Sequence, residues 1–472
     1  MALQGIFRRP SGAGNAPQFP VAVVGAGESA ARLVRTMEKN ANSIRRPLFF
    51  ISRGEASGPE LEGLPVYEGA HAESMLRKHG VREVILAVPD AESAELMELY
   101  NEYTALECKV RVGDPETGRV RDFSIEDLMF HHPVAIDESA ALEFYRGKTI
   151  LITGGGGVIG NELCRQLARF RPAQLVVLDV SESNVYALQQ NLRLLYGANL
   201  NFRAVLGSVR DRHCLDDVFR LYQPQIVFHA AANNNVSLME ENAAEAIKNN
   251  VFGMRNAADY AEAYGAEKFI LLSADKAVNP TSILGGAKRM GELLIHSRVQ
   301  SETVFAAVRF GNILDSPDGV IPLFRRQIEH GGPVTITDRR AFRFFISLAD
   351  AVRLIIDAGV IAQPGDLLVF GTGKPLNIYE LAVNMISLAG FSPEGDVAVQ
   401  EIGLRPGEKM TEELLVAPGN VQTTSNARIW REQEPPFRPD EIEVKVTVLS
   451  DAVANHSDIH AAMRHVIPTY QG

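Results

Sequence analysis

The sequence predicts an α/β protein made of two unequal domains, each with a doubly wound parallel sheet. A short apolar strand, a glycine turn, an amphipathic helix and a second strand follow one another over residues 19–52, and the same order restarts at residues 148–179. After the restart, strand-like and helical stretches alternate up to about residue 310. This strict alternation is typical of a parallel sheet with helices on both faces.

The first domain is predicted over residues 18–113, after a Gly-, Pro- and Ala-rich tail at 1–17 that we expect to be flexible. Its strands are expected at FPVAVV, PLFFIS and VREVILAVP, with helices at ESAARLVRTMEK and HAESMLRKHG. The apolar runs have the length of buried strands, and the helical stretches repeat their apolar residues every three or four positions. The acidic, irregular stretch 114–142 is predicted to be a connector.

The second domain is predicted over residues 143–417. Its strands are expected at KTILIT, AQLVVLDV, NFRAVLGS, PQIVFHAAA, KFILLSA and TVFAAVRFGN. From about residue 310 the alternation becomes irregular, with GGPVTITD, DLLVFGTG and the helical NIYELAVNMISLAG, which indicates a smaller C-terminal substrate lobe. Residues 418–472 are predicted to be an extension of unknown role. Both domains are therefore expected to be Rossmann-like.

Composition excludes several classes of function. The 472 residues carry 58 acidic and 47 basic side chains, a formal net charge of −11, without a cluster of Lys and Arg. A nucleic-acid or polybasic membrane-surface role is therefore unexpected. Three distant cysteines, Cys108, Cys164 and Cys214, suit a reducing cytoplasm. The sequence shows neither a signal peptide nor a run of ~18 apolar residues, so we expect no membrane segment.

The first glycine turn combines Gly25 and Gly27 with Ala30 directly after a strand. Glycines there allow a tight turn and the close approach of a pyrophosphate to a helix N-terminus. The next strand, however, ends at Ser52 and Arg53, where a ribose-binding carboxylate is expected. We therefore predict a structural turn and no NAD site in the first domain.

The second glycine turn, TGGGGVIG at residues 153–160, has the pattern T-G-x-x-G-x-x-G between a strand and a helix. Asp179 ends the next strand 19 positions after Gly160, where a carboxylate can accept hydrogen bonds from the adenosine ribose. An acidic residue there favours NAD over NADP, whose 2′-phosphate it would repel. We therefore predict that NAD binds to the second domain.

Polar residues follow the strand KFILLSA. Ser273, Asp275 and Lys276 stand at its carboxyl end, and Lys288 lies on the next predicted helix. Catalytic groups of open α/β sheets gather at such strand ends. The alternative for each of these residues is a solvated polar loop.

With these motifs, the sequence resembles the extended short-chain dehydrogenase/reductases, specifically the polysaccharide-biosynthesis (CapD-type) nucleotide-sugar 4,6-dehydratases. The resemblance rests on TGGGGVIGNELCRQL, HAAANNNVSLMEENAAEAIKNNVFG, SADKAVNP, GAKRMGELL, GGPVTITD and GLRPGEKMTEELL. In that family a hydride passes from the sugar C4 to NAD, a C5 proton is removed, water leaves from C6, and the hydride returns to C6. The resemblance implies the same fold, cofactor and reaction for this chain.

The resemblance also implies roles for individual residues. Asp275 corresponds to the general acid for the departing C6 hydroxyl, Lys276 to the base for the C5 proton, and Lys288 to the lysine that binds the nicotinamide ribose. A lysine base needs a lowered pKa, which burial beside Lys288 and the charged nicotinamide would supply. The expected cofactor contacts are Gly154, Gly157, Val158, Ile159, Gly160, Asp179, Ser208, Val209, Ala230, Ala231 and Lys288. The expected substrate contacts are Asn235, Asn312, Leu323, Arg343, Arg405 and Glu408, with Asn312, Arg343, Arg405 and Glu408 near the diphosphate.

The sequence departs from the family pattern close to these residues. Ala274 stands where the family commonly has Thr. Leu284 stands where ordinary short-chain dehydrogenases have Tyr and where this family usually has Met. Ser273 or Lys276 then remain to take the proton of the C4 hydroxyl. Further departures are Val158, Ser208, Asn234, Asn235 and Asp315.

Histidines offer no metal site in the sequence. His456 and His460 stand four apart on a predicted helix, but S-D-I between them lacks the Glu of a zincin, and a surface helix is expected. His131 and His132 lie in the predicted connector without an evident partner. We expect no metal.

The preferred interpretation is an NAD-dependent dehydratase that converts a nucleotide sugar, UDP-N-acetylglucosamine, to a 4-keto-6-deoxy product for surface polysaccharide or glycan synthesis. Two alternatives stay open: a nucleotide-sugar epimerase or 4-ketoreductase on the same fold, and a catalytically weakened nucleotide-sugar-binding protein. A homo-oligomer is expected. Family members often carry an N-terminal membrane region, so the chain is either a member without one or part of a longer protein.

Overall fold

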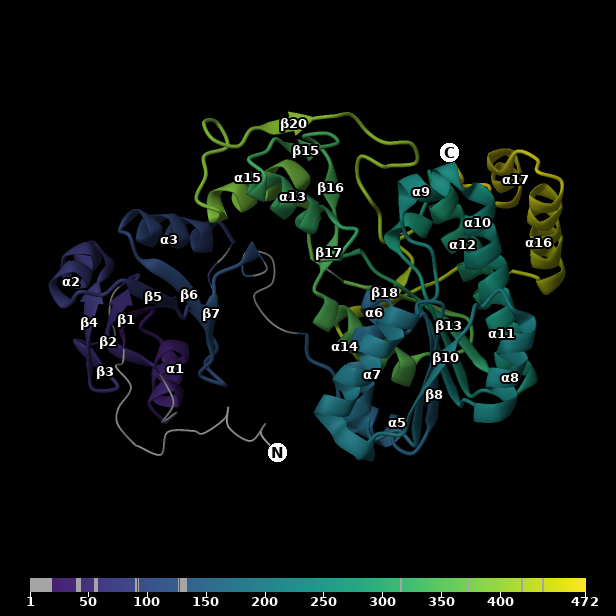
Figure 1. Ribbon diagram of the computed structural model, residues 1–472, viewed down its shortest axis with the longest axis horizontal. Coiled ribbons are helices and arrows are strands. Elements are labelled where there is room, and N and C mark those ends of the chain that lie inside the picture. The colour runs from purple at the N-terminus through teal and green to yellow at the C-terminus, as the bar shows by residue number, and fades with distance from the viewer. Residues whose placement is uncertain are drawn as a thin grey trace, which may run out of the picture. The chain divides into compact units, whose positions relative to one another are not determined.

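The computed structural model divides the chain into two compact units, residues 1–132 and 133–472 (Figure 1). It describes residues 19–39, 44–54, 58–89, 91, 93–125, 127, 134–314, 316–371, 373–416, 419–434 and 437–472. The predicted tail at 1–17, His131, His132 and Asp315 lie outside the described residues. Among the described helices, none combines the length and the apolar character that crossing a membrane requires.

The first unit is a doubly wound sheet in the order β3-β4-β2-β1-β5-β6-β7. The strands β1, β2, β4, β5 and β6 pair in parallel, whereas β3 and β7 are antiparallel edges. Their bounds are β1 (Phe19–Val24), β2 (Arg45–Ser52), β3 (Glu60–Leu61), β4 (Leu64–Glu68), β5 (Glu83–Leu86), β6 (Lys109–Gly113) and β7 (Val120–Asp122), with helices α1 (Glu28–Lys39), α2 (Ala72–His79) and α3 (Ser93–Ala105).

The second unit has a larger sheet in the order β10-β9-β8-β11-β12-β13-β18-β22-β21. The strands from β10 to β18 are parallel, and β22 and β21 continue the sheet antiparallel. Their bounds are β8 (Thr149–Thr153), β9 (Gln174–Asp179), β10 (Phe202–Leu206), β11 (Ile226–His229), β12 (Lys268–Leu272), β13 (Val304–Arg309), β18 (Asp366–Phe370), β21 (Val421–Thr423) and β22 (Ile429–Glu432). The predicted α/β class with two doubly wound sheets is confirmed.

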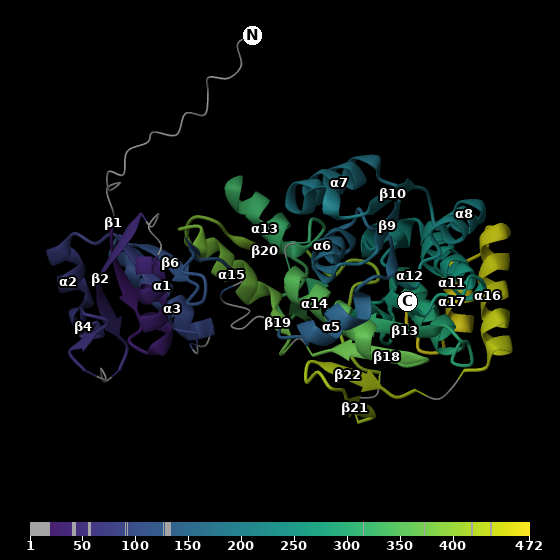
Figure 2. The ribbon, with the colours of Figure 1, turned by 90° about the horizontal axis from the view of Figure 1, so that it is seen from below.

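Helices cover both faces of this second sheet, each over its own apolar core (Figure 2). One face carries α5 (Glu138–Tyr145), α6 (Val158–Leu167), α7 (Glu182–Tyr196) and α14 (Leu348–Ile361). The other carries α8 (Arg212–Tyr222), α10 (Ala243–Ile247), α11 (Met254–Ala263), α12 (Ile283–His296), α16 (Pro439–Ala454) and α17 (Ile459–Val466). Because α16 and α17 pack over α12, residues 283–295 of that helix are buried.

A small lobe holds short strands and two helices beside this sheet. Its elements are β14 (Asn312–Ile313), α13 (Val320–Glu329), β15 (Val334–Ile336), β16 (Phe342–Arg343), β17 (Phe345–Ile346), β19 (Leu376–Asn377), α15 (Ile378–Leu388) and β20 (Val399–Glu401). Helix α9 (Val236–Glu241) comes from the main part of the unit. The predicted lobe strand DLLVFGTG is an exception: it forms β18 and pairs with β13 in the main sheet, where its side chains are buried.

Two predicted segments differ from the structure. The connector 114–142 is split, because β7 pairs with β6 in the first unit and α5 buries Ala141 and Tyr145 in the core of the second. The extension 418–472 is part of the second unit, because β22 pairs with β18 and α16 and α17 contribute Ile442, Leu449 and Met463 to its core. Helices α5, α16 and α17 are stabilised because their apolar side chains are buried in the cores of the second unit.

Candidate functional site

The second glycine turn joins β8 to α6 and allows very close backbone contacts. Gly154 has φ +71°, and a Cβ there would lie 2.6 Å from the backbone nitrogen of Ala231. A Cβ on Gly160 would lie 2.3 Å from the carbonyl oxygen of Gly154. The turn therefore needs glycine at both positions, and it leaves the N-terminus of α6 open to an anionic group.

Asp179 ends β9 beside this turn. Its Oδ2 accepts a hydrogen bond from the Gly156 amide at 2.9 Å, and its Oδ1 accepts one from the Ser181 amide at 2.8 Å. These bonds hold the carboxylate at the carboxyl edge of the sheet, where it can also accept hydrogen bonds from a diol.

A cavity of ≈ 500 Å³ extends from this turn across the sheet edge. All the residues predicted to contact the cofactor line it: Gly154, Gly157, Val158, Ile159, Gly160, Asp179, Ser208, Val209, Ala230, Ala231 and Lys288. Ser273, Ala274, Asp275, Lys276 and Leu284 line its far end. A glycine cradle, a helix N-terminus and a strand-end carboxylate along one cavity fit a dinucleotide.

Lys288 reaches this cavity from α12. Its Nζ donates a hydrogen bond to the carbonyl of Leu272 at 3.1 Å. Burial lowers the pKa of Lys288 to about 8, an effect that Glu292 opposes and Lys276 adds to. The side chain is therefore a fixed cation near neutral pH.

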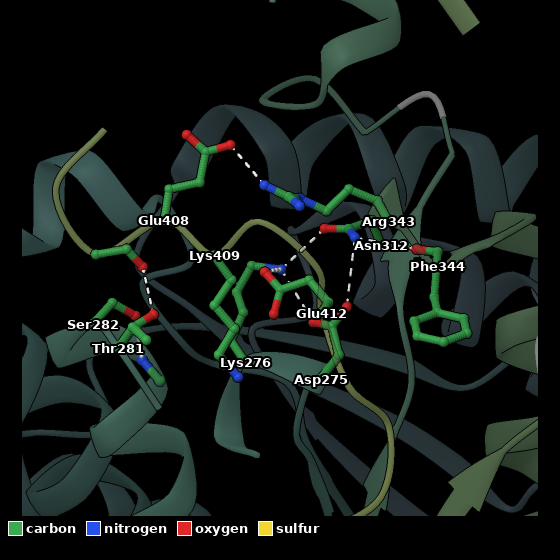
Figure 3. Close-up of polar contacts among 12 residues, drawn as sticks. Asp275, Lys276, Thr281, Ser282, Asn312, Arg343, Phe344, Glu408, Lys409 and Glu412 are labelled. Carbon is green, nitrogen blue, oxygen red and sulfur yellow. Dashed lines mark hydrogen bonds and ion pairs between the residues drawn. The ribbon is translucent and has the colours of Figure 1, made fainter. Parts of the chain in front are cut away.

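Asp275 and Lys276 follow β12 at its carboxyl end, and Figure 3 shows their polar contacts. Asp275 is fully buried. Lys276 Nζ donates hydrogen bonds to Asp275 Oδ1 at 3.1 Å and to Asn312 Oδ1 at 3.0 Å. Asn312, on β14, donates from Nδ2 to the Phe344 carbonyl at 3.1 Å, which fixes the amide that meets Lys276.

The two charged groups respond differently to this environment. Burial raises the pKa of Asp275 to about 6, although Lys276 opposes the shift. A carboxyl group in this range can donate a proton near neutral pH. Burial alone would lower the pKa of Lys276, but Asp275 and Glu412 outweigh it, and the pKa is raised. The protein's own groups thus raise the pKa of Lys276, and the lowering expected from the charged nicotinamide stays a prediction.

Ser273 is connected to a buried ion cluster beneath the site. Its hydroxyl donates to Glu292 Oε1 at 2.7 Å, so its proton is committed to that carboxylate. Glu292 in turn accepts from Arg309 Nε at 3.0 Å and from Arg309 Nη2 at 2.7 Å. Arg309 also donates to Glu432 Oε2 at 2.6 Å. Strand β13, helix α12 and strand β22 are thus tied together below Ser273.

A second cavity, of ≈ 540 Å³, lies between the lobe and the main sheet. All the predicted substrate contacts line it: Asn235, Asn312, Leu323, Arg343, Arg405 and Glu408. Arg343 Nη2 donates to Glu408 Oε1 at 2.6 Å, and the Arg405 amide donates to Glu408 Oε2 at 3.2 Å. The Arg405 side chain is exposed.

The two cavities adjoin at the polar cluster. Lys276, Asn312, Asn234 and residues 317–319 line both. A ligand in one cavity therefore meets a ligand in the other beside Asp275 and Lys276.

Leu284 and Ala274 bring no polar side chain to this junction. Leu284 is buried at the start of α12 and lines the first cavity. Among the polar residues that sequence reasoning missed is Glu412, which is 5% exposed and lines the second cavity. Its Oε1 lies 3.9 Å from Lys276 Nζ. Its only sequence signal was its place in GLRPGEKMTEELL.

Metal ligands do not gather in the part of the chain that the structure describes: no three or more His, Cys, Asp or Glu side chains lie as metal ligands would. His460 shares a hydrogen bond with the Tyr470 hydroxyl at 2.8 Å and lies 3.6 Å from Glu240 Oε2. The three cysteines are free.

The glycine turn of the first unit follows β1. Gly25 has φ +113°, and a Cβ there would lie 2.7 Å from the carbonyl oxygen of Ala87, whereas a Cβ on Gly27 would meet nothing within 4 Å. Arg53, after the end of β2, forms an ion pair with Glu95.

Comparison with known families matches residues 150–434 to a family model described as polysaccharide biosynthesis protein. The chain is 37% identical over 405 residues to the probable polysaccharide biosynthesis protein EpsC of Bacillus subtilis, covering 83% of this chain and 68% of EpsC. It is 36% identical over 408 residues to the capsular polysaccharide biosynthesis protein CapD of Staphylococcus aureus, covering 83% of this chain and 68% of CapD. A UDP-glucose 4-epimerase of Rickettsia prowazekii is 33% identical over 57% of this chain and 77% of the epimerase.

Solved structures with the same fold include Pen from Bacillus thuringiensis, 31% identical, with a TM-score of 0.57 over 62% of this chain and 90% of Pen. DesIV, a dTDP-glucose 4,6-dehydratase from Streptomyces venezuelae solved with NAD and TYD bound, is 22% identical, with a TM-score of 0.50 over 56% of this chain and 88% of DesIV. DesIV shares the fold.

Proposed function

This chain belongs to the polysaccharide biosynthesis protein family, and from that premise we propose that it is an NAD-dependent nucleotide-sugar 4,6-dehydratase. The proposed substrate is UDP-N-acetylglucosamine, and the product is the corresponding 4-keto-6-deoxy sugar nucleotide. The names of EpsC and CapD support a role in making precursors of surface polysaccharide. Free cysteines suit a reducing compartment, and we place the reaction in the cytoplasm.

The observation that carries the proposal is the junction of the two cavities. Asp275 and Lys276 lie where a cavity with a dinucleotide-type cradle meets a cavity with Arg343, Arg405 and Glu408. A dehydratase needs both ligands at one point, because the sugar carbons that react must lie beside the cofactor and an acid at the same time. Asp275 lines the first cavity and Lys276 lines both.

The residues of the first cavity fit NAD. We assign Gly154 and Gly160, with the N-terminus of α6, to the pyrophosphate, Asp179 to the adenosine ribose, and Lys288 to the nicotinamide ribose. When bound, NAD supplies a hydride acceptor that returns the hydride in the same cycle. DesIV, which shares this fold, was solved with NAD bound.

Asp275 is the proposed proton donor to the departing C6 hydroxyl. Its carboxyl group is fully buried, and its raised pKa, about 6, keeps a protonated fraction available near neutral pH. In the second cavity, the Arg343 and Arg405 guanidinium groups are suited to the oxygens of a diphosphate. Arg343 is already oriented by Glu408, so it presents its charge in one position.

A nucleotide-sugar 4-epimerase is the second candidate, favoured by the 33% identity to the Rickettsia UDP-glucose 4-epimerase. It shares the need for NAD and a nucleotide sugar, but it needs no acid at C6. The buried Asp275 beside Lys276 favours dehydration.

The proposal is tested by incubating the purified chain with UDP-N-acetylglucosamine and following the sugar nucleotide by mass spectrometry and NMR. Dehydration predicts the loss of one water without net consumption of NAD, whereas an epimerase gives an isomer of unchanged mass. Asp275→Asn should lower the rate by about 10²–10⁴-fold while NAD stays bound. An unchanged substrate, or full activity of Asp275→Asn, would contradict the proposal.

A further inference from the structure

Helix α17 does more than complete the core of the second unit, because it also reaches a charged residue of α9. His460 Nε2 lies 3.6 Å from Glu240 Oε2, and His460 Nδ1 shares a hydrogen bond with the Tyr470 hydroxyl at 2.8 Å. Burial, with Glu240 adding, raises the pKa of Tyr470, so this hydroxyl keeps its proton and can donate to Nδ1. The proton of the neutral ring is then on Nε2, the nitrogen that faces Glu240.

Glu240 connects α9 to the start of α12. Its Oε1 accepts a hydrogen bond from the amide of Ile283, the first residue of α12, at 2.6 Å. The first amides of a helix have no partner within the helix, and the helix dipole also favours a carboxylate there. The Glu240 side chain is only 11% exposed, so water competes little for this bond. Glu240 therefore fixes the point at which α12 begins.

Glu240 also supports the loop 405–408, which carries two of the predicted diphosphate contacts. Gly407 has φ +74°, and a Cβ there would lie 2.7 Å from Ser282 Cβ and 3.1 Å from Glu240 Oε1. The Gly407 carbonyl accepts a hydrogen bond from Thr281 Oγ1 at 3.0 Å. Thr281, Ser282 and Gly407 line the second cavity, and Glu240 lies behind them. A shift of Glu240 would therefore move the wall of that cavity.

The end of the described chain holds the same wall from outside. Helix α17 packs so closely against α12 that a Cβ on Gly286 would lie 2.6 Å from Met463 Sδ (Figure 1). After this helix, the Gln471 amide donates a hydrogen bond to the Pro280 carbonyl at 2.8 Å. Pro280 directly precedes the cavity residues Thr281 and Ser282. Helix α17 and the residues after it thus meet the support of the second cavity at several points.

We propose that Glu240 is a positioning residue for the second cavity, and that α17 holds it there through His460 and Tyr470. The nucleoside diphosphate part of the substrate then binds to a loop and a helix start whose places Glu240 fixes. This inference rests on the proposed function, because it takes the second cavity to hold the nucleotide sugar. It gives the stretch 418–472 a part in substrate binding in addition to its part in the core.

The test measures the binding of UDP to the full chain loaded with NAD, by calorimetric titration. The variants are Glu240→Ala, Glu240→Gln, His460→Ala and the double variant Glu240→Ala with His460→Ala. Glu241→Ala is the matched control, because Glu241 is the exposed neighbour of Glu240 on the same helix. Thermal unfolding and the amount of NAD retained show whether each variant is folded.

We expect Glu240→Ala to raise the Kd of UDP by about 10-fold, as the loss of a hydrogen bond to a charged group does. Glu240→Gln should recover part of this loss, because its amide oxygen can still accept from the Ile283 amide. Glu241→Ala should bind UDP like the wild type. With UDP-N-acetylglucosamine, Glu240→Ala should raise KM while kcat changes by less than about threefold.

Retention of NAD separates positioning from a general loss of structure. Lys288, which we assign to the nicotinamide ribose, is on α12 as well, so a loosened α12 would release NAD together with UDP. We expect the variants to lose UDP affinity and to keep NAD. His460→Ala should weaken UDP binding less than Glu240→Ala and should add nothing in the double variant, because His460 acts through Glu240. His460→Ala also gives the answer if Glu240→Ala does not fold.

Three results would overturn the inference while the dehydratase proposal stands. They are an unchanged UDP affinity in Glu240→Ala, a joint loss of UDP and NAD, and additive losses for Glu240→Ala and His460→Ala. If the wild type binds no UDP, the assignment of the second cavity to the nucleotide sugar fails, and the role of Glu240 fails with it.

Discussion

The two units use the same strand–turn–helix start with different results. In both, the first glycine has a positive φ and presses against the neighbouring strand's end, Gly25 against Ala87 and Gly154 against Ala230 and Ala231. The difference lies further on: the third turn position is Ala30 in the first unit and Gly160 in the second, and the next strand leads to Arg53 or ends at Asp179. Sheet packing alone thus demands the first glycine, whereas the later positions distinguish a ligand cradle from a structural turn.

The strongest test of this difference is a matched pair of glycine substitutions. A Cβ on Gly160 would lie 2.3 Å from the Gly154 carbonyl oxygen, whereas one on Gly27 would meet nothing within 4 Å. We expect Gly160→Ala to lower the free energy of unfolding of the second unit by about 1–3 kcal/mol and to abolish NAD retention. Gly27→Ala should change stability by less than about 0.5 kcal/mol.

The single tryptophan, Trp430 on β22, reports the second unit separately in urea unfolding. Hydrogen exchange of peptides from β1 and α1 reports the first. If Gly160→Ala and Gly27→Ala lower the free energy of unfolding of their units equally, the two turns do not differ in their need for glycine at these positions.

The charge at the end of the second strand is the next difference. Asp179→Asn removes the anion that we assign to the adenosine ribose, so NAD affinity should fall by about 1.5–3 kcal/mol. Calorimetric titration of the NAD-free chain measures this change. The control is Asn201→Asp, on the same unit but outside both cavities, and an equal loss there would remove the special role of Asp179.

A buried histidine gives only the second unit a particular acid sensitivity. His229 shares a hydrogen bond with Thr153 Oγ1 at 2.9 Å, and burial, with Lys288 adding, lowers its pKa from 6.5 to about 3. The described histidines of the first unit, His71 and His79, are exposed. Because the pKa of His229 is lower in the folded than in the unfolded chain, unfolding takes up a proton at this residue below pH 6.5. The contribution of neutral His229 to the free energy of unfolding is therefore complete above pH 6.5 and is lost as the pH falls toward 3.

Between pH 6.5 and pH 3, His229 should lower the free energy of unfolding by about 1.4 kcal/mol for each unit that the pH falls. His229→Gln, which cannot be protonated, should flatten the pH dependence of unfolding followed by Trp430 fluorescence. An identical slope in the variant and the wild type would assign the acid sensitivity to other groups.

The smallest effect is expected at Arg53 in the first unit. Its ion pair with Glu95 is partly exposed, with 31% and 39% of the two side chains accessible, so Arg53→Ala should destabilise by less than about 1 kcal/mol. NAD affinity should stay unchanged. A loss of NAD affinity in this variant would mean that the first unit also takes part in binding.

Patterns that are local in the chain predicted much of this molecule. The buried strand runs and glycine turns located β1, β8, β9 and β12, and the residues predicted from motifs line the two cavities. The strand DLLVF was placed in the lobe because its sequence is equally apolar in either place. Only its pairing with β13, far away in sequence, decides that it joins the main sheet.

Long-range charge contacts account for what sequence reasoning missed. Lys276 and Glu412 are separated by 136 positions, and no local pattern indicates that a glutamate of an irregular segment returns to Lys276. Asp275 and then Glu412 raise the pKa of Lys276 against the effect of burial. A family motif can suggest which residues are important, but the charge state of each follows from its neighbours in three dimensions.

Arg309 has a consequence for the order in which this site is built. Its guanidinium bridges Glu292, which holds Ser273, and Glu432, which accepts the Val416 amide at 2.5 Å. The glycine turn of the first cavity is synthesised early. The contacts of Arg309 with both Glu292 and Glu432 can form only after strand β22 has been synthesised. A ribosome-bound chain that lacks strand β22 would already carry the glycine turn of the first cavity, but Arg309 would lack Glu432, one of its two carboxylate partners.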